Sequence, residues 1–209
     1  MLNHITCISG VSCGGKTAVL KDLDRSVSPK GAQLTVMVSD VTRDLRSDNE
    51  AFRRHVSFED HAYRTSMDEY IQTIEYGGNF YSVRQCEVDE ALQENKYVLV
   101  DCIPDGVRQF AKHHPTKAAF IFAWPRELCK RHILRGSSPQ EMRWRLANAE
   151  VELRAAIESG LYDLYINNTD LEEAKRRVVA FLDGECVVSD SVDMEAYSAE
   201  LREVLNELK

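Results

Sequence analysis

The chain has 209 residues, enough for one substantial core with small inserted pieces. Its formal net charge of −8 disfavours a nucleic-acid-binding surface, because phosphate backbones require broad basic faces. No apolar run reaches the roughly 20 residues of a membrane span, and the start Met-Leu-Asn-His lacks the pattern of a signal peptide, so we expect a cytoplasmic protein without membrane partners.

The first strongly patterned stretch, residues 10–17, reads Gly-Val-Ser-Cys-Gly-Gly-Lys-Thr and fits the phosphate-binding pattern G-x-x-x-x-G-K-[ST]. A β-branched run (4–9) precedes it and predicts a buried strand, and residues 18–23 are apolar at helical spacing. In this context backbone N–H groups surround a polyphosphate, Lys16 reaches its outer oxygens and the Thr17 hydroxyl is placed for Mg²⁺. The alternative, a chance match on a glycine-rich turn, is disfavoured by these flanking elements.

The next stretch, residues 39–84, is predicted to be an insert with strands of its own. It follows a predicted strand at 33–38. From residue 47 to about 64 no apolar period of 2 or 3.6 is sustained, and the pattern resumes at 67–74. A turn signal at 77–79 and a short strand at 80–83 follow.

After the insert, strands alternate with helices. We expect strands at 97–103, 118–123 and 161–168, and helices at 86–94, 106–112, 126–134, 140–159 and 171–182. This order predicts a parallel sheet covered by helices on both faces, with Asp101 at the carboxyl edge of a central strand, where ligands bind. Residues 185–209 predict a helical extension that packs on the domain or on a dimer partner.

Cysteines and arginines are each distributed in an informative way. The six cysteines have no metal-ligand spacing, so we expect free, mostly buried thiols, with Cys13 in the phosphate loop as the exception.

Two arginine-rich clusters on an acidic chain favour small phosphorylated ligands, although each can also be a solvated helix face. The clusters are Arg43, Arg46, Arg53 and Arg54, and Arg126, Lys130, Arg131, Arg135, Arg143 and Arg145.

Beyond the loop, the chain resembles guanylate kinases over roughly residues 4–183. Residues 39–46 are similar to their S-x-T-T-R-x-P-R segment, 78–81 to G-N-Y-Y and 100–106 to L-D-I-D-x-Q-G. Residues 130–136, 145–146 and 168–171 resemble their later R-L, R-G, R-L and N-D-D-L positions.

The resemblance implies a P-loop kinase fold and a set of roles. The core would comprise residues 1–38 and 85–184 with a lid at about 132–143, the nucleotide-monophosphate insert 39–84, and the extension 185–209. The catalytic residues would be Lys16, Arg131, Arg135 and Arg145. ATP phosphates would bind Gly10, Ser12, Cys13, Gly14, Gly15, Lys16 and Thr17, and Asn168 would lie on the adenine side. The acceptor would bind Ser39, Arg43, Arg46, Gln72, Tyr81, Val83, Asp101 and Ile103, and Mg²⁺ would bind Thr17 and, through water, Asp101.

The departures from the family pattern concern the acceptor base. Gln72 stands where the family has glutamate, Val83 where it has Ser or Thr, and Ile103 where it has a second Asp. Guanine N–H donors would be poorly matched, which is unfavourable in a closed site. The G-E-V-x-G-x-D-Y segment is replaced by residues 47–55, and an ungapped alignment sets its tyrosine at His55.

These patterns predict a kinase that transfers phosphate from ATP to a nucleoside or deoxynucleoside monophosphate. The base of this acceptor need not be guanine, and a pyrimidine is compatible with the lost contacts. Two alternatives stay open. A ribose 1,5-bisphosphate phosphokinase, which has no base to read, shares the Thr42-Arg43-Asp44 segment. A non-catalytic guanylate-kinase-like binding module typically lacks the P-loop lysine and lid arginines that are present here.

Overall fold

The computed structural model describes residues 5–45, 50–94 and 96–208 and has a mixed α/β fold with a parallel sheet flanked by helices. Five strands form this sheet in the order β2-β7-β1-β8-β9, and four form a second sheet in the order β4-β3-β6-β5. The predicted α/β class with a parallel sheet is confirmed. The residues divide into two compact units, Met1–Cys7 with Leu20–Lys117, and Ile8–Val19 with Ala118–Lys209.

The unit Ile8–Val19 with Ala118–Lys209 has the glycine-rich loop and the helices of the second half of the chain. Strands β8 and β9 pair in parallel, and the Phe122↔Asn167 pair ends the ladder. Ser138 caps α6 through the Glu141 N–H, and Gly160 ends that helix in the left-handed conformation. The elements are β1 (Ile5–Gly10), α1 (Lys16–Leu23), β8 (Thr116–Phe122), α5 (Pro125–Leu134), α6 (Pro139–Ser159), β9 (Leu164–Asn167), α7 (Leu171–Leu182) and α8 (Met194–Glu207), of which β1, α1 and β8 begin or end in the other unit.

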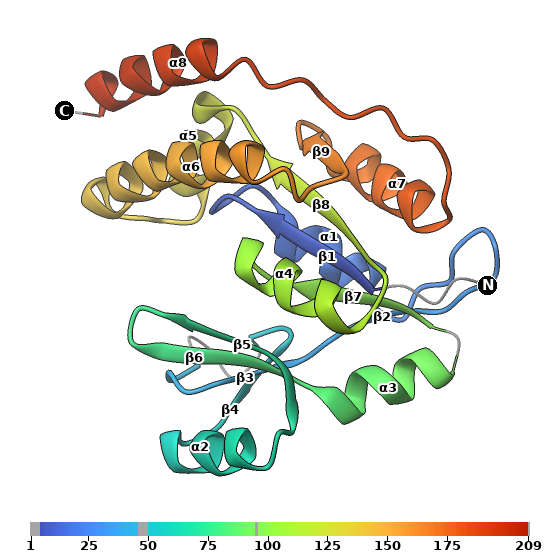
Figure 1. Cartoon of the computed structure of the whole chain (residues 1–209). Helices are drawn as coiled ribbons and strands as arrows, with labels where there is room; N and C mark the ends of the chain where they lie inside the picture. The colour runs from blue at the N-terminus through green and yellow to red at the C-terminus, as the bar shows by residue number, and fades with distance from the viewer. Residues whose placement is uncertain (1–4, 46–49, 95, 209) are drawn as a thin grey trace. The chain divides into compact units, whose positions relative to one another are not determined.

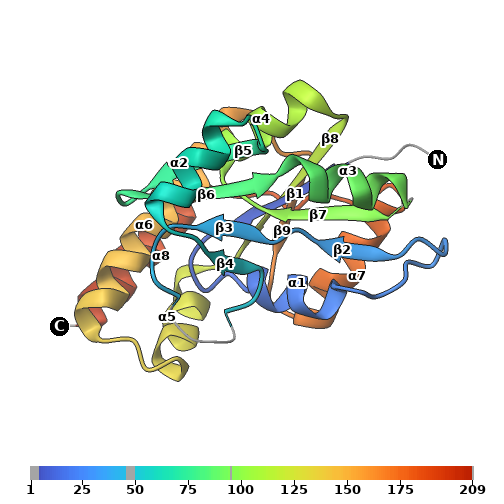
Figure 2. The ribbon, with the colours of Figure 1, turned by 90° about the horizontal axis from the view of Figure 1, so that it is seen from below.

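The unit Met1–Cys7 with Leu20–Lys117 has the second sheet, whose strands β3, β4 and β6 are seen from below in Figure 2, and the parallel pair β2 and β7. Strand β3 pairs in parallel with β4 and antiparallel with β6. The elements are β2 (Leu34–Val36), β3 (Ser39–Val41), β4 (Arg53–His55), α2 (Phe58–Ser66), β5 (Tyr70–Tyr76), β6 (Asn79–Arg84), α3 (Gln85–Gln93), β7 (Tyr97–Asp101) and α4 (Pro104–His113).

Three expectations about secondary structure were wrong in detail. The stretch without periodicity contains β4 and the helix α2, which Ser57 caps by accepting from the Asp60 N–H. Its only buried helical residue is His61, so the helix has no apolar stripe that a periodicity test would detect. The predicted strand at 33–38 is shorter, because β2 ends at Val36 and residues from Ser39 join the other sheet, and β9 is shorter than predicted. All six cysteines are free, but the expectation that most are buried was wrong: Cys7 and Cys102 are buried, Cys13 and Cys129 are partly exposed, and Cys86 and Cys186 are exposed.

The C-terminal helix α8 packs along α5 and α6 of its own unit, as Figure 1 shows. Its apolar seam is Tyr197, Leu201 and Val204, all buried. The Tyr197 hydroxyl donates to the Ala123 carbonyl at 3.2 Å, and its ring lies 5.6 Å from that of Trp124. The predicted helix is therefore present, and its apolar stripe is covered by neighbouring helices of the same chain.

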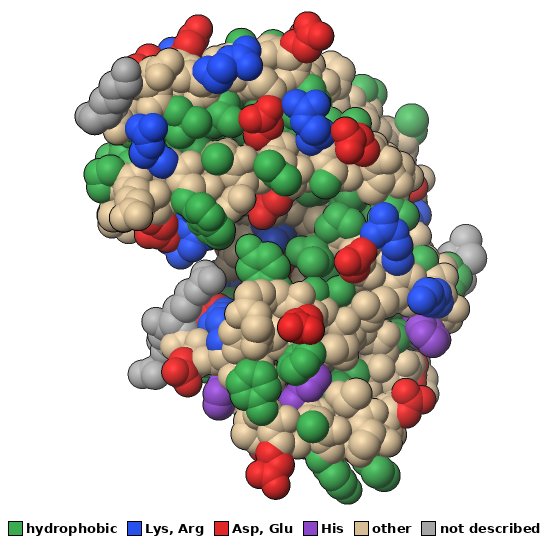
Figure 3. Space-filling model, turned by 60° about the vertical axis from the view of Figure 1, so that its left-hand side comes forward, with side chains coloured by type: hydrophobic (Ala, Val, Ile, Leu, Met, Phe, Trp, Pro, Cys, Tyr) green, Lys and Arg blue, Asp and Glu red, His purple; other side chains and the backbone are tan. Residues whose placement is uncertain are grey.

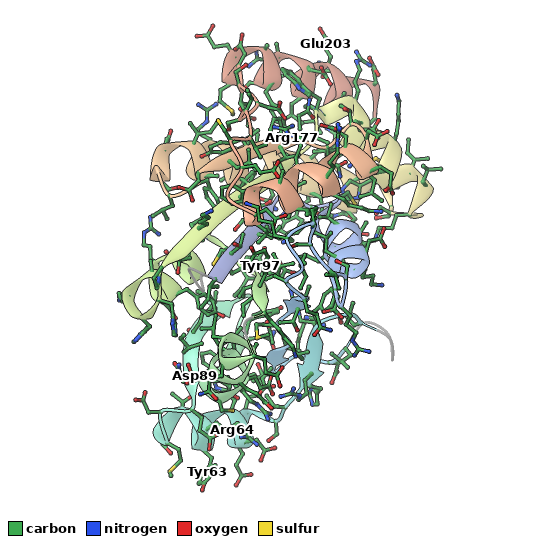
Figure 4. The ribbon with its side chains drawn as sticks, turned by 90° about the vertical axis from the view of Figure 1, so that its right-hand side faces the viewer. Tyr63, Arg64, Asp89, Tyr97, Arg177 and Glu203 are labelled. Atoms are coloured by element: carbon green, nitrogen blue, oxygen red, sulfur yellow. The ribbon has the colours of Figure 1, made fainter. Side chains whose placement is uncertain are left out.

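The outer side of α8 is charged. Figure 3 shows acidic and basic side chains interspersed along the upper surface of the molecule, where this helix lies, and Figure 4 labels Glu203 there. One arginine at the start of α5 binds this row of carboxylates: Arg126 Nη2 lies 3.0 Å from Glu203 Oε2 and Nη1 lies 3.1 Å from Glu207 Oε2. These pairs are exposed, so each contributes at most about 1 kcal/mol, and the apolar seam holds the helix.

We predict that Tyr197→Ala lowers the free energy of unfolding by about 3–5 kcal/mol, because it leaves a large cavity under α8. Tyr197→Phe removes only the buried hydroxyl and is expected to cost about 1 kcal/mol. Urea denaturation followed by circular dichroism measures both. Tyr63→Ala is the control, since the Tyr63 side chain on α2 is 62% exposed and its loss should change stability by less than about 0.5 kcal/mol. Equal effects of the alanine substitutions at Tyr197 and Tyr63 would contradict the assignment.

Candidate active site

The loop between β1 and α1 is fixed to the edge of the sheet by backbone hydrogen bonds. The Val11 N–H donates to the Ile121 carbonyl at 3.2 Å, and the Gly14 N–H donates to the Val11 carbonyl at 3.0 Å. A Cβ atom at Gly10 would lie 2.2 Å from the Ile121 oxygen, so this position has room only for glycine. The first glycine of the motif is thus required by the close approach of two strands.

Within the loop, two residues adopt left-handed backbone conformations. Gly15 has φ of 97° and Cys13 has φ of 59°. Glycine accepts this region without strain, whereas a side chain there costs roughly 1–2 kcal/mol. The loop leads directly into α1, whose first residue is Lys16 and whose second, Thr17, is exposed. The positive end of the α1 dipole therefore lies at the end of the loop that carries both side chains.

Arg131, in the last turn of α5, holds the loop from its carbonyl side. Its Nη1 donates to the carbonyl oxygens of Cys13 at 3.3 Å and Gly14 at 3.2 Å, and its Nη2 donates to the Asn168 carbonyl at 2.5 Å. Its Nε donates to Glu127 Oε1 at 2.9 Å, one helical turn earlier. The guanidinium thus binds three backbone carbonyl oxygens and connects the loop to α5 and to Asn168.

Two further arginines reach the same loop. Arg145, on α6, donates from Nη1 to Ser12 Oγ at 3.1 Å and from Nε to Glu141 Oε1 at 2.8 Å. Arg135, which caps the end of α5, has its Nη1 at 3.8 Å from Cys13 Sγ. The structure therefore brings Arg131, Arg135 and Arg145 to residues 12–14, as expected of groups that neutralise phosphate.

His132 is a neighbour of the loop that the sequence did not single out. It is buried, and its Nδ1 lies 3.5 Å from Cys13 Sγ and 3.1 Å from Ser137 Oγ. Burial lowers the pKa of His132, and the positive charges of Arg145 and Arg135 lower it further. The imidazole is therefore neutral near pH 7, and in this cluster the arginines carry the positive charge.

Asn168, which follows β9, lies against the loop. Its Nδ2 donates to the Gly14 carbonyl at 2.8 Å, and a Cβ atom at Gly15 would lie 2.0 Å from the same nitrogen. Its Oδ1 is buried and accepts no hydrogen bond within the described part of the chain. The amide expected on the adenine side thus also supports the loop, and the closeness explains why position 15 is glycine. We call residues 10–17 with Arg131, Arg135, Arg145 and Asn168 the loop site.

The loop site fits Mg²⁺ as a partner of bound phosphate. Across residues 5–45, 50–94 and 96–208, no group of three or more His, Cys, Asp or Glu side chains could hold a metal ion unaided. Mg²⁺, however, usually takes one or two protein oxygens, with phosphate and water completing its shell. The exposed hydroxyl of Thr17 is such an oxygen. It would hold the ion, which would supply positive charge to the phosphates.

We predict that Gly10→Ala weakens ATP binding, because the new methyl group must displace either the loop or the Ile121 carbonyl. Overpacking of this kind costs about 1–3 kcal/mol, so affinity should fall at least about fivefold, as measured by isothermal titration calorimetry. The control is Gly160→Ala at the end of α6, where φ is 62° and nothing lies within 4 Å of the added Cβ. It should lose about 1 kcal/mol of stability and bind ATP unchanged. Wild-type affinity in Gly10→Ala would refute the role given to this glycine.

In the other unit, Arg43 and Tyr81 are neighbours, as expected of acceptor-phosphate ligands. Arg43 Nε donates to the Tyr81 hydroxyl at 3.1 Å, and its two terminal nitrogens bind the two carboxylate oxygens of Glu50. Hydrogen bonding to Glu50 raises the pKa of Arg43, which keeps it charged. Arg46, the third residue predicted here, lies outside the described residues.

Four side chains form a row across the second sheet, which we call the cross-strand row: Arg53, Ser39, Val83 and Gln72. The Cα register pairs Arg53 with Ser39, Ser39 with Val83, and Val83 with Gln72. Paired residues on neighbouring strands point to the same face of a sheet, so the four side chains share one face. Three of them were predicted as base-reading residues, and the register explains why they occur on three different strands.

The cross-strand row faces the end of β7 and the start of α4. Arg53 Nη2 donates to Asp101 Oδ2 at 2.6 Å, and its Nη1 lies 3.4 Å from Ser39 Oγ. At the other end of the row, Gln72 Nε2 lies 3.6 Å from where a Cβ at Gly106 would be. Ile103, the residue immediately before α4, is 42% exposed. We call the cross-strand row with Arg43, Tyr81, Asp101 and Ile103 the sheet site.

Asp40, next to Ser39 on β3, neutralises the opposite face of the same sheet. Its side chain is fully buried and accepts from Arg54 Nη1 at 3.1 Å, Arg84 Nε at 2.8 Å and the Tyr70 hydroxyl at 2.9 Å. Burial raises the pKa of Tyr70, and its hydrogen bond to Asp40 raises it further, so the phenol stays a donor. One carboxylate thus ties together strands β3, β4 and β5 and the residue that ends β6.

We predict that Asp40→Asn lowers the free energy of unfolding by about 3 kcal/mol or more, because Arg54 and Arg84 lose a fully buried counter-charge and, among the described residues, keep only Glu87, at 2.9 and 3.9 Å. Chemical denaturation monitored by fluorescence measures this loss. Asp105→Asn is the matched control, since its ion pair with Arg108 is exposed and should contribute less than about 1 kcal/mol. Similar losses in the two variants would show that Asp40 has no special structural role.

Several residues of these sites were not found from the sequence. Glu127 and Glu141 each lie four residues before an arginine of the loop site, and this i,i+4 spacing on a predicted helix could have identified them. Arg53 was recognised only as part of an arginine cluster. An ungapped alignment favoured His55, whose Nδ1 lies 3.0 Å from the Arg43 carbonyl, whereas the strand register puts Arg53 beside Ser39.

Comparisons with known proteins agree with this geometry. The family model described as guanylate kinase matches residues 3–185. A guanylate kinase of Bartonella quintana (strain Toulouse) is 32% identical over 151 residues, covering 69% of this chain and 67% of that protein. One of Helicobacter pylori (strain ATCC 700392 / 26695) is 30% identical over 189 residues, covering 85% of each chain. The crystal structure of guanylate kinase from Anaplasma phagocytophilum superposes with a TM-score of 0.63 at 23% identity, covering 88% of this chain and 86% of that one, which indicates a common fold.

Proposed function

Because the chain belongs to the guanylate kinase family, we propose that it transfers the terminal phosphoryl group of ATP to a nucleoside or deoxynucleoside monophosphate. The observation that carries the proposal is the convergence of Arg131, Arg135 and Arg145 on the glycine-rich loop. A loop that only bound a nucleotide would not need three arginines from two helices. Charge concentrated in this way supports stabilisation of a phosphoryl group in transfer.

The chemistry follows from charge and position. A phosphoryl group in transfer spreads negative charge over its oxygens, and the protein accelerates the reaction by aligning the reactants and neutralising that charge. Lys16 and the loop N–H groups would hold the ATP phosphates, and Thr17 would hold Mg²⁺, which neutralises them further. Arg131, Arg135 and Arg145 would act on the transferring group, and Asn168 would border the adenine.

On the acceptor side, Arg43 and Tyr81 would bind the phosphate of the monophosphate, with Arg46 as a third ligand. Glu50 holds Arg43 and would be exchanged for that phosphate, because both present oxygens to the same guanidinium nitrogens. Ser39, Gln72, Val83, Ile103 and Asp101 would contact the nucleoside. Of these, Val83 and Ile103 bring no polar atom, so the proposed acceptor is a nucleotide other than GMP.

A ribose 1,5-bisphosphate phosphokinase is the second candidate. Apolar side chains at positions 83 and 103 favour it, because a sugar phosphate has no base to read. The hydrogen bond between Arg43 and Tyr81 favours a nucleotide acceptor, since this pair comes from the segments that resemble the nucleotide-monophosphate pattern. A binding module without catalysis is disfavoured by the retention of Lys16 and of the three arginines at the loop.

We further propose a division into core (1–38 and 85–184), insert (39–84) and lid (about 132–143), a water-mediated contact of Asp101 with Mg²⁺, a cytoplasmic location, and a homodimer through the C-terminal helix. Within the described helices, none combines the length and hydropathy that crossing a membrane would need.

We predict that the protein releases ADP from ATP in the presence of at least one nucleoside monophosphate, measured by a coupled assay over the common ribo- and deoxyribonucleotides. Lys16→Ala should lower kcat at least about 100-fold, because it removes a charge that stabilises the transferring phosphates. Lys130→Ala is the control, since the Lys130 side chain is 73% exposed on α5. If the protein turns over ribose 1,5-bisphosphate and none of the nucleotides, the result would favour the sugar-phosphate kinase. Phosphotransfer unaffected by Lys16→Ala would contradict the proposed loop function.

A further inference from the structure

We propose that Arg53 determines the specificity of the acceptor site and selects a pyrimidine nucleoside monophosphate. This inference rests on the proposed kinase function and goes beyond it, because it names a residue and a class of base. Arg53 occupies the end position of the cross-strand row, beside Ser39, and its side chain is 15% exposed. No pattern in the sequence gave it a separate role from its neighbour Arg54.

Asp101 is the carboxylate of the sheet site, and it faces the row. Asp101 Oδ2 accepts from Arg53 Nη2 at 2.6 Å, and the Asp101 side chain is 12% exposed. A partly buried ion pair of this kind is unfavourable to separate, because each charge would be left without its partner. Asp101 is therefore held by Arg53 rather than directed at the N–H groups of a base.

The four side chains of the row differ in their hydrogen-bonding capacity. Arg53 only donates, Ser39 and Gln72 can do both, and Val83 does neither. Guanine accepts from an arginine at O6 and N7, but its N1–H and N2–H₂ require acceptors. In the row only the Ser39 hydroxyl and the Gln72 oxygen can accept, and neither is charged, so this edge of guanine would be incompletely matched. Unmatched polar groups in a closed site are strongly disfavoured.

A pyrimidine matches the same row. Every pyrimidine base has a carbonyl oxygen at C2, which accepts from a guanidinium, and a donor and an acceptor side by side at N3 and C4: N3–H and O4 in uracil and thymine, N3 and N4–H₂ in cytosine. The Gln72 amide, with one oxygen and one NH₂, is complementary to such an edge in either orientation. The apolar side chains of Val83 and Ile103 are compatible with the unsubstituted or methylated carbon side of the ring.

Size supports the same conclusion. The Arg53 side chain crosses from β4 to Asp101 at the end of β7, and it fills space along the face of the row. A single-ring base needs less of that space than a purine does. Arg53 would therefore contact a pyrimidine while it occupies space beside Ser39 that a second ring would need.

The experiment measures kcat/KM of the wild-type protein for CMP, UMP, dCMP, dUMP, dTMP, GMP, dGMP, AMP and dAMP at fixed ATP and Mg²⁺. We expect the best pyrimidine to exceed GMP at least tenfold. Arg53→Gln should lower kcat/KM for that pyrimidine about 10- to 100-fold, mainly through KM, because it removes a charged hydrogen bond to the base. It should also raise kcat/KM for GMP, because Asp101 is released as an acceptor.

A double variant separates this role from general damage. Adding Asp101→Asn to Arg53→Gln should abolish the gain with GMP, since the released carboxylate is then absent. Arg64→Gln is the matched control: Arg64, on α2 and labelled in Figure 4, also loses a carboxylate partner, Glu69, but does not belong to the row. It should leave the ratio between pyrimidine and GMP unchanged.

The outcomes distinguish the two levels of the argument. Turnover of GMP in preference to every pyrimidine, or an unchanged pyrimidine-to-GMP ratio in a folded Arg53→Gln protein, overturns this inference and leaves the kinase function standing. Absence of turnover with all nine nucleotides overturns the proposed function itself. If Arg53→Gln does not fold, Arg53→Lys replaces it, and a KM for the pyrimidine equal to that of the wild type would refute the contact between the Arg53 guanidinium and the base.

Discussion

Three of the arginines that would bind phosphate are each held by a carboxylate within the chain, and this pairing is the constraint on which both candidate sites depend. Glu127 and Glu141 hold Arg131 and Arg145 from one helical turn away, and in the other unit Glu50 holds Arg43. Long flexible side chains lose entropy when they are fixed, so prior fixing lowers the unfavourable entropy of ligand binding. The carboxylates thus position the positive charges of the arginines and balance them in the absence of a phosphate.

The same constraint takes a more permanent form in the second sheet. Asp40 is fully buried and binds Arg54 and Arg84 on one face, while Asp101 binds Arg53 on the other. Asp40 has a structural role because three elements meet at its two oxygens. The pair of Arg53 and Asp101 is different, since it lies in the row that would contact the acceptor, where its charges can be redistributed when a ligand binds.

The loop site was largely predictable from the sequence, and the sheet site was not. Backbone N–H groups, glycines and a helix start build the loop, and they lie within eight consecutive residues that a pattern can describe. Close approach also fixes Gly10, because the Ile121 carbonyl leaves no room for a side chain. The sheet site combines residues from β3, β4, β5 and β6, so its composition depends on strand register. Register is set by tertiary packing, which is why Arg53 was missed.

This difference explains how one half of a two-substrate site can stay recognisable while the other changes. A polyphosphate is bound chiefly by backbone groups and fixed charges, and substitutions there remove function altogether. A base is bound by a few side chains on separate strands, and each can change without altering the sheet that carries it. In this chain Val83 is fully buried within its strand, and Arg53 forms an ion pair with an aspartate at a strand end. The donor chemistry would then be retained by the fold, whereas the choice of acceptor would be set by the side chains of a single cross-strand row.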